Sequence, residues 1–274
     1  MNVNDYEKFY YKKAEEKSGF DDGWRKYILD FIKNNAPVGG TVLELGCGEG
    51  EFAGKFGDNI SYCGVDVSAF AVDSANKKNI AADGKFKLIN PDDSELPFGD
   101  KYFDFVFGVY SLEHFKKPRK MLDEAVRVLK PKGYLILLAP NLEFPFARIN
   151  AVRHKGFLYK TGLCAARIYD YLMRIFGVSK FRTIKENFTS ATGKYEKLDD
   201  DLTYIVSSFE VINYLKREHF LKEIFSCKMD KNEETGKIKG SIKRFVALLP
   251  AMKYYGNVLF AIMQKHSNQT EVKY

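Results

Sequence analysis

The sequence predicts an α/β protein built on a seven-stranded, mostly parallel sheet with helices on both faces. Three observations predict this fold class. One apolar segment ends in a glycine-rich turn at positions 46–50, a second ends in Asp66, and seven apolar segments of strand length are interspersed with segments of helical periodicity. Glycines directly after a buried strand are typical of Rossmann-like sheets, in which ligands bind at the carboxyl ends of the strands.

The first of these elements is a short strand followed by three glycines. Residues 41–45 form a mainly apolar run, and Gly46, Gly48 and Gly50 follow it at alternate positions. Bare backbone in such a turn lets a ligand approach closely. We expect a helix from about Glu51, whose first N–H groups would face that ligand. A plain glycine turn between strand and helix is the alternative interpretation.

Two other glycine-rich ligand sites can be excluded from the spacing. A dinucleotide fingerprint would need its third glycine at the position of Glu51, and a phosphate loop would need a Lys directly after Gly50. The acidic side chain of Glu44 would also repel a pyrophosphate. The same charge suits a ligand that carries positive charge.

A second landmark is the acidic residue that ends the next predicted strand. Asp66 follows Gly46 by twenty residues, which is the spacing at which a carboxylate binds ribose hydroxyls in nucleotide-binding α/β folds. A carboxylate can accept two hydroxyl hydrogen bonds at once. The alternative role for Asp66 is a helix N-cap, but Ser68 could serve as that cap equally well.

A third landmark is an acidic segment between two further strands. Residues 89–98 read Ile-Asn-Pro-Asp-Asp-Ser-Glu-Leu-Pro-Phe, and they lie between predicted strands at 85–89 and 103–109. By itself, such a run of acidic and polar residues would indicate a solvated loop.

Taken in order, these motifs resemble the class I S-adenosylmethionine-dependent methyltransferases. The glycine turn resembles their motif I, and residues 92–106 resemble the D-x-x-x-L-P-F…F-D-x-V segment of the ubiquinone/menaquinone-type and related small-molecule enzymes. Residues 122–133 resemble a run that usually ends R-V-L-K-P-G-G, although Lys132 replaces the first glycine of the pair. The resemblance covers about residues 41–140.

The resemblance implies S-adenosyl-L-methionine as the cofactor and a set of residues that contact it. Asp92 would bind the adenine amino group and Asp93 would offer a backbone N–H to the ring. The whole implied set is Glu44, Gly46, Cys47, Gly48, Gly50, Asp66, Val67, Asp92, Asp93, Gly108 and Tyr10. Tyr10 would close over the cofactor, although a position in the core or on the surface is the alternative for this side chain.

We expect one methyltransferase domain over residues 1–274. Its parts are an N-terminal helical cap (1–40), a cofactor-binding core (41–141), an insertion after the fifth strand (142–205) and the remaining core with the C-terminal strands (206–274). By the resemblance, the cap and the insertion determine the acceptor. Periodicity predicts helices at 5–35, 164–176 and 208–218, a fifth strand at 134–139, and last strands at 221–227 and 257–263.

His114 is the candidate general base. It lies just after the fourth predicted strand, at the edge where α/β folds bind ligands, and imidazole titrates near neutrality. A hydroxyl acceptor must lose its proton during attack on the activated methyl group, so a base there would be useful. A structural His that holds the loop is the alternative, and His154 in the insertion is a second candidate.

Composition and charge narrow the range of possible binding partners and cellular locations of the protein. The chain has 274 residues, 45% of them hydrophobic, and a net charge of +7, with 22 Lys and Arg against 13 Asp and Glu in residues 151–274. This basic half suits an anionic partner, such as a phosphate-bearing acceptor or a membrane surface, and a solvated lysine-rich face is the alternative. The four cysteines show no metal-ligand spacing, so no metal is expected, and they favour a reducing, cytoplasmic location. The basic half adds peripheral contact at the inner membrane face as an option. The oligomeric state is not predicted.

The sequence therefore predicts an S-adenosylmethionine-dependent methyltransferase (EC 2.1.1.-) that acts on a small-molecule acceptor. A loose resemblance around residues 200–220 to enzymes of polysaccharide biosynthesis favours a hydroxyl or amine of a sugar or glycolipid precursor. The alternatives are a quinone or other lipid-like acceptor, or a catalytically idle module that only binds S-adenosylmethionine. Nucleic acid is not expected as an acceptor, because residues 108–111 lack the N/D-P-P-Y/F motif of base-modifying enzymes.

Overall fold

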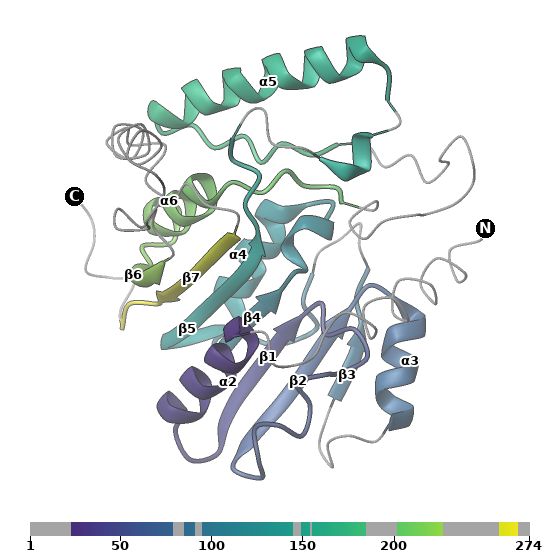
Figure 1. Cartoon of the computed structure of the whole chain (residues 1–274). Coiled ribbons are helices and arrows are strands. Elements are labelled where there is room, and N and C mark those ends of the chain that lie inside the picture. Colours follow the sequence, from purple (N-terminus) through teal and green to yellow (C-terminus); the bar gives the residue numbers. More distant parts are fainter. Residues whose placement is uncertain are drawn as a thin grey trace.

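A seven-stranded sheet forms the centre of the computed structural model, which describes residues 23–78, 85–90, 95–144, 149–153, 155–184, 202–226 and 258–267. The strands are β1 (Gly40–Leu45), β2 (Ile60–Asp66), β3 (Lys85–Leu88), β4 (Phe103–Val109), β5 (Leu129–Pro140), β6 (Lys222–Ser226) and β7 (Val258–Gln264). Their order is β3-β2-β1-β4-β5-β7-β6, and β7 runs antiparallel to both of its neighbours (Figure 1). The predicted seven-stranded, mostly parallel sheet is confirmed.

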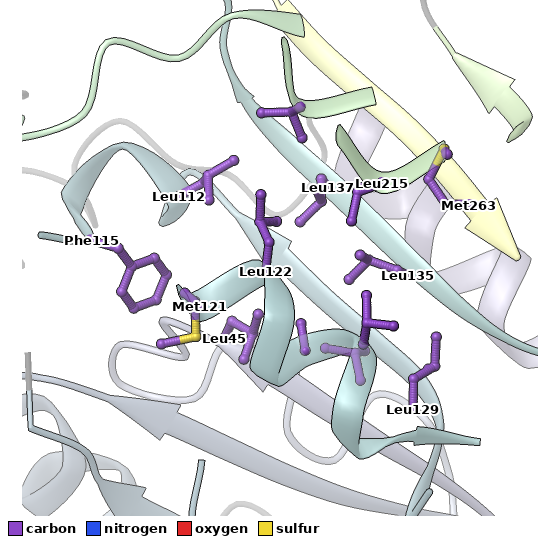
Figure 2. Close-up of a cluster of buried hydrophobic side chains, with 14 of the residues drawn as sticks. Leu45, Leu112, Phe115, Met121, Leu122, Leu129, Leu135, Leu137, Leu215 and Met263 are labelled. Carbon is purple, nitrogen blue, oxygen red and sulfur yellow. The ribbon is translucent and has the colours of Figure 1, made fainter. Parts of the chain in front are cut away.

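Helices cover both faces of this sheet because its central strands are apolar on both sides. On one face α2 (Gly23–Asn35) and α3 (Ala69–Lys78) pack on a cluster that includes Val42 and Ile136. On the other face lie α4 (Pro118–Val128) and α6 (Ser208–Glu218). Figure 2 shows Leu122 and Leu215 from these two helices beside Leu135 and Leu137 of β5. Successive β5 residues thus alternate between the two cores, as strand geometry requires.

The helix predicted from about Glu51 is wrong. Residues 48–54 form successive turns and residues 55–56 form a bend, with hydrogen bonds such as Ala53 N–H to Gly50 O at 3.0 Å and Lys55 N–H to Phe52 O at 3.1 Å. The physical reason is the glycines further along this segment. Gly54 and Gly57 adopt positive φ values of 73° and 78°, and a residue in that conformation cannot continue a right-handed helix.

Other boundaries differ from the predicted ones by smaller amounts. Of the helix predicted at 5–35, residues 23–35 form α2 and residues 5–22 lie outside the described part of the chain. The fifth strand begins at Leu129 rather than at position 134. Lys132, which stands where the resemblance has a glycine, adopts a left-handed φ of 64°. A non-glycine residue is uncommon in this region, so the backbone here keeps the conformation that glycine would favour.

The insertion after β5 forms a separate layer. It contains the 3₁₀ turn η2 (Asn150–Val152) and α5 (Phe157–Ile175), which begins earlier than predicted and is the outermost helix in Figure 1. A third apolar cluster holds the insertion together, formed by Ile149, Val152, Ile184, Leu202 and Ile205. Within the described ranges, no helix has both the length and the apolar character that a membrane span would need.

Candidate functional site

The glycine turn after β1 has a backbone conformation that requires glycine. Gly46, Gly48 and Gly50 have φ values of 71°, 52° and 82°. The N–H groups of Gly46 and Cys47 both donate to Val65 O, at 2.8 and 3.0 Å, and so fix the turn against β2. A Cβ at Gly46 would overlap the Cβ of Ser111. The turn is therefore bare backbone at the carboxyl end of β1, which suits close approach of a ligand.

Asp66 connects the end of β2 to this turn. Its Oδ2 accepts the N–H of Gly48 at 2.8 Å, and its Oδ1 accepts the N–H of Ser68 at 2.9 Å. The side chain is 7% exposed, and burial raises the pKa of Asp66 although the N–H groups of Ser68, Gly48 and Val67 and the charge of His114 favour its ionised form. An ionised carboxylate has about four acceptor sites, so hydroxyl groups of a ligand could still bind here.

The capping role is taken by Ser68 and not by Asp66. The Oγ of Ser68 accepts the N–H of Ala71 at 3.1 Å, and its carbonyl accepts the N–H of Val72, which together begin α3. This leaves Asp66 at the edge of the sheet with no helix to cap. Its neighbour Val67 is 40% exposed.

Glu44 lies deeper than its expected role would suggest. It is buried in β1 and accepts a hydrogen bond from the hydroxyl of Tyr62, and burial raises the pKa of Glu44 well above its ordinary value. The guanidinium of Arg25, which pairs with Glu51, acts against that rise. Whether this carboxyl group meets a cationic ligand directly stays a prediction. The thiol of Cys47 is also buried, and burial raises its pKa, so only the backbone of Cys47 fits a ligand contact.

The end of β4 meets the glycine turn through a residue that the sequence did not single out. A Cβ at Gly108 would come within 2.9 Å of the Oγ of Ser111, and the same Ser111 blocks a Cβ at Gly46. Before it, Tyr110 has a left-handed φ of 50°, and its N–H donates to Leu138 O at 2.7 Å. Non-glycine residues in this conformation are concentrated at functional sites. The sequence contains one indirect sign of this packing, because glycines stand at the ends of both strands that meet here, Gly46 after β1 and Gly108 in β4.

His114 ends the 3₁₀ turn η1 (Leu112–His114), which directly follows this point. Its N–H donates to Ser111 O at 3.1 Å, and its Nε2 lies 3.9 Å from Oε1 of Glu113, a carboxylate that is 1% exposed. The carbonyl of Glu113 accepts the N–H groups of Thr203 and Tyr204, both at 2.9 Å. The returning end of the insertion therefore fixes the position of η1 and His114. The charge of His114 lowers the pKa of Asp66, so these two side chains interact electrostatically.

Several predicted residues cannot be placed. Tyr10, Asp92, Asp93 and the second candidate base His154 lie outside the described residues. The segment that leads to Asp92 does start at the site, because the N–H of Ile89 donates to Asp66 O at 2.9 Å. Among the described residues, no group of three or more His, Cys, Asp or Glu side chains could hold a metal ion.

A buried carboxyl group lies just beyond the end of β5. Glu143 is 2% exposed, and its Oε2 accepts the N–H of Phe209 in the first turn of α6 at 3.3 Å. Burial raises the pKa of Glu143 to about 7, and the charge of Glu210 adds to the rise while that of Arg174 opposes it. No sequence pattern marks this group, since a single Glu after a strand usually faces solvent.

The comparisons with known proteins match the same part of the chain. Residues 43–137 match the family described as "Methyltransferase domain". A demethylmenaquinone methyltransferase from Thermotoga maritima is 34% identical over 129 residues, which cover 45% of this chain and 54% of that protein. A ubiquinone/menaquinone biosynthesis C-methyltransferase from Citrobacter koseri is 31% identical over 121 residues, which cover 42% of this chain and 47% of that protein. The chain thus spans about half the length of these two relatives.

A solved structure extends the similarity in fold to most of the chain. The S-adenosylmethionine-dependent methyltransferase from Mesorhizobium loti superposes with a TM-score of 0.53 at 14% identity and covers 90% of this chain and all of that one. The family match in sequence, by contrast, ends near the end of β5, before the insertion begins.

Proposed function

We propose that this chain, whose core is that of a class I S-adenosylmethionine-dependent methyltransferase, transfers a methyl group to a lipid-like small molecule of the quinone type. The cofactor of this core is S-adenosylmethionine, which supplies a methyl group already activated on a sulfonium. The observation that carries the proposal is the hydrogen bond of 2.8 Å between the backbone of Gly48 and the carboxylate of Asp66. It joins the glycine turn to the acidic strand end in one binding edge.

The residues of this edge fit the cofactor in two respects. Gly46, Gly48 and Gly50 present bare backbone at positive φ, so the methionine part of the ligand can approach the turn closely. Asp66 keeps acceptor sites for ribose hydroxyls beyond its backbone bonds. Catalysis of an in-line displacement then rests mainly on holding the acceptor at near-attack distance.

His114 is the residue we propose as general base. A ring hydroxyl gains nucleophilic strength as it loses its proton, so a base beside it promotes methylation at oxygen or at a ring carbon. The buried carboxylate of Glu113, 3.9 Å away, would stabilise the imidazolium that forms. Because Thr203 and Tyr204 hold η1, binding of an acceptor by the insertion can adjust the position of His114.

The acceptor class rests on the relatives that share the core. The Thermotoga and Citrobacter proteins are named for menaquinone and ubiquinone pathways, and neither name supports the sugar or glycolipid acceptor that the sequence favoured. The matched residues hold the cofactor edge and not the insertion, so the acceptor is the part of the proposal that most needs an experiment. The basic half keeps phosphate-bearing acceptors among the candidates.

The experiment is a methylation assay with an acceptor panel. Purified protein would be incubated with S-adenosylmethionine labelled in its methyl group and with hydroxylated quinone precursors, a nucleotide sugar or a glycolipid precursor. We expect label to appear in the quinone-type compound, with product formed only when Asp66 is intact. Label in the sugar compounds alone would overturn the acceptor assignment, and cofactor binding without any product would favour the idle binding module.

A further inference from the structure

The helix α5 buries three of its four charged residues and exposes several of its large apolar ones. Its three buried positions are Arg167, Asp170 and Arg174, which recur at three- and four-residue spacing and so share one face. Arg167 donates to Leu142 O at 2.8 Å and to Phe144 O, just beyond the end of β5. Asp170 is paired with Arg182, and Arg174 lies 4.0 Å from Glu210. Polar contacts thus fix this inner face of α5 to the protein.

The opposite side of the same helix is apolar and open to solvent. It presents Leu158, Ile168, Tyr169, Leu172 and Ile175, and Phe176 extends it beyond the last turn. We call these six residues the outer face of α5. Leu158 is 85% exposed and Phe176 is 79% exposed. The other four residues are between 40% and 51% exposed.

This arrangement of charged and apolar side chains is the reverse of the usual one for a helix at a protein surface. A surface helix of a globular protein normally turns its apolar stripe inward and its charges outward. Here the desolvation of three charged groups accompanies the exposure of apolar side chains along about five turns of helix, so a covering surface would stabilise the protein. Figure 1 shows α5 at the periphery of the molecule, where such a surface can reach it.

The charge around the outer face points to an anionic partner. Among the described residues between positions 149 and 184, Asp170 is the one carboxylate side chain, and it is fully buried. Basic groups lie beside the first turn of α5 and beside Tyr169 in its second half. The Nζ of Lys155 lies 5.6 Å from the ring of Tyr159, and the Nζ of Lys180 lies 6.0 Å from the ring of Tyr169. A second copy of the chain placed symmetrically on this face would bring like charges together.

We propose that the outer face of α5 docks on the surface of an anionic lipid bilayer. Apolar side chains would enter the boundary between headgroups and acyl chains, and the flanking lysines would meet anionic headgroups. Tyr169 suits this boundary because it has an apolar ring and a polar hydroxyl. The docked helix lies in the plane of the interface and does not cross it.

Docking in this orientation would place the methyl-transfer edge beside the lipid. The contacts of Arg167 with residues 142 and 144 put α5 at the carboxyl end of β5, the same edge of the sheet as Gly48 and Asp66. An acceptor dissolved in the bilayer could then enter without crossing water. The docking surface itself does not rest on the proposed function, since its test needs neither cofactor nor acceptor.

The test is co-sedimentation of the full chain with vesicles. One set would contain phosphatidylcholine alone and the other phosphatidylcholine with about a third phosphatidylglycerol, at low and at physiological salt. The variant Ile168→Gln/Leu172→Gln replaces two outer-face side chains with polar residues of good helix propensity. Val38→Gln is the matched control, because Val38 is 95% exposed in a turn remote from α5.

We expect the wild type and Val38→Gln to sediment with anionic vesicles, less so at higher salt, and the double variant to bind about tenfold more weakly or worse. Failure of the wild type to bind anionic vesicles, or equal binding by the double variant, would overturn the proposal. A lower melting temperature of the double variant without lipid would show that this chain covers the face itself. A dimer that the double variant dissociates would show that a second copy covers it, and either result would also reject the bilayer.

Discussion

Replacing Glu143 with Gln should stabilise the protein, and the gain should depend on pH. Glu143 is 2% exposed beyond the end of β5, and burial raises its pKa from an ordinary value of 4.5 to about 7. The charged groups that act on it are Arg174, which favours the ionised form, and Glu210, which opposes it. Gln keeps the shape and an oxygen that can accept the N–H of Phe209.

The sign and the size follow from proton linkage. Below about pH 4.5 the carboxyl group is protonated in both the folded and the unfolded protein, so it has no effect on stability. Between about pH 4.5 and 7 the unfolded chain loses this proton first, so the wild type loses stability as the pH rises. The rise of the pKa from 4.5 to about 7 corresponds to at most about 3–4 kcal/mol, and an imperfectly satisfied amide could reduce the gain by about 1 kcal/mol.

The assay is thermal unfolding of wild type and Glu143→Gln at pH 5 and pH 8. The variant should melt at nearly the wild-type temperature at pH 5 and several degrees higher at pH 8, since 1 kcal/mol shifts the melting temperature of a chain of this size by about 2–4 °C. Glu95→Gln is the control, because it makes the same replacement at a side chain that is 75% exposed. A constant gap between pH 5 and pH 8 for Glu143→Gln, or a variant that is less stable at pH 8, would show that burial does not hold this carboxyl group neutral.

Two further substitutions test the site. Gly46→Ala places a Cβ against Ser111 at a φ of 71°, so the affinity for S-adenosylmethionine should fall at least about tenfold and the folded state should lose about 1–3 kcal/mol of stability. Gly99→Ala is the control, because open space surrounds Gly99, and it should change neither quantity. Calorimetry measures the affinity and thermal melting the stability, and a Gly46→Ala variant that is unaffected in both would contradict the tight contact. His114→Ala should lower the turnover rate by about two to four orders of magnitude with little change in cofactor affinity, as measured by steady-state kinetics and titration. Parallel losses of rate and affinity would instead make His114 a structural residue.

The sequence predicted the parts of the fold that depend on local pattern. Gly46, Gly48 and Gly50 all adopt the positive φ that their residue type allows, and Asp66 ends its strand beside them. The strands form where apolar runs are bounded by turns, and α6 spans the predicted residues 208–218. The helix predicted after Glu51 does not form because Gly54 and Gly57 interrupt it.

What the sequence could not predict are relations between distant segments. Periodicity showed an apolar side on α5 but not that Arg167, Asp170 and Arg174 would face the protein, because period alone does not say which side is buried. The hydrogen bonds from Thr203 and Tyr204 to the carbonyl of Glu113 join residues about ninety positions apart in the sequence. Burial against α6 likewise raises the pKa of Glu143 and the charge of Arg174 opposes this rise, and neither α6 nor Arg174 is near Glu143 in the sequence.

The joined edge of Gly48 and Asp66 should bind S-adenosylmethionine, and the proposed methyl transfer depends on that binding. Calorimetric titration of the wild type, Asp66→Ala and the surface control Asp58→Ala measures it without any knowledge of the acceptor. We predict one binding site in the wild type and the control, and a loss of about 2–3 kcal/mol in Asp66→Ala, equivalent to roughly 30- to 150-fold in affinity, with the fold retained by circular dichroism. No binding by the wild type, or an Asp66→Ala variant that binds as tightly as the wild type, would mean that this edge is not the cofactor site.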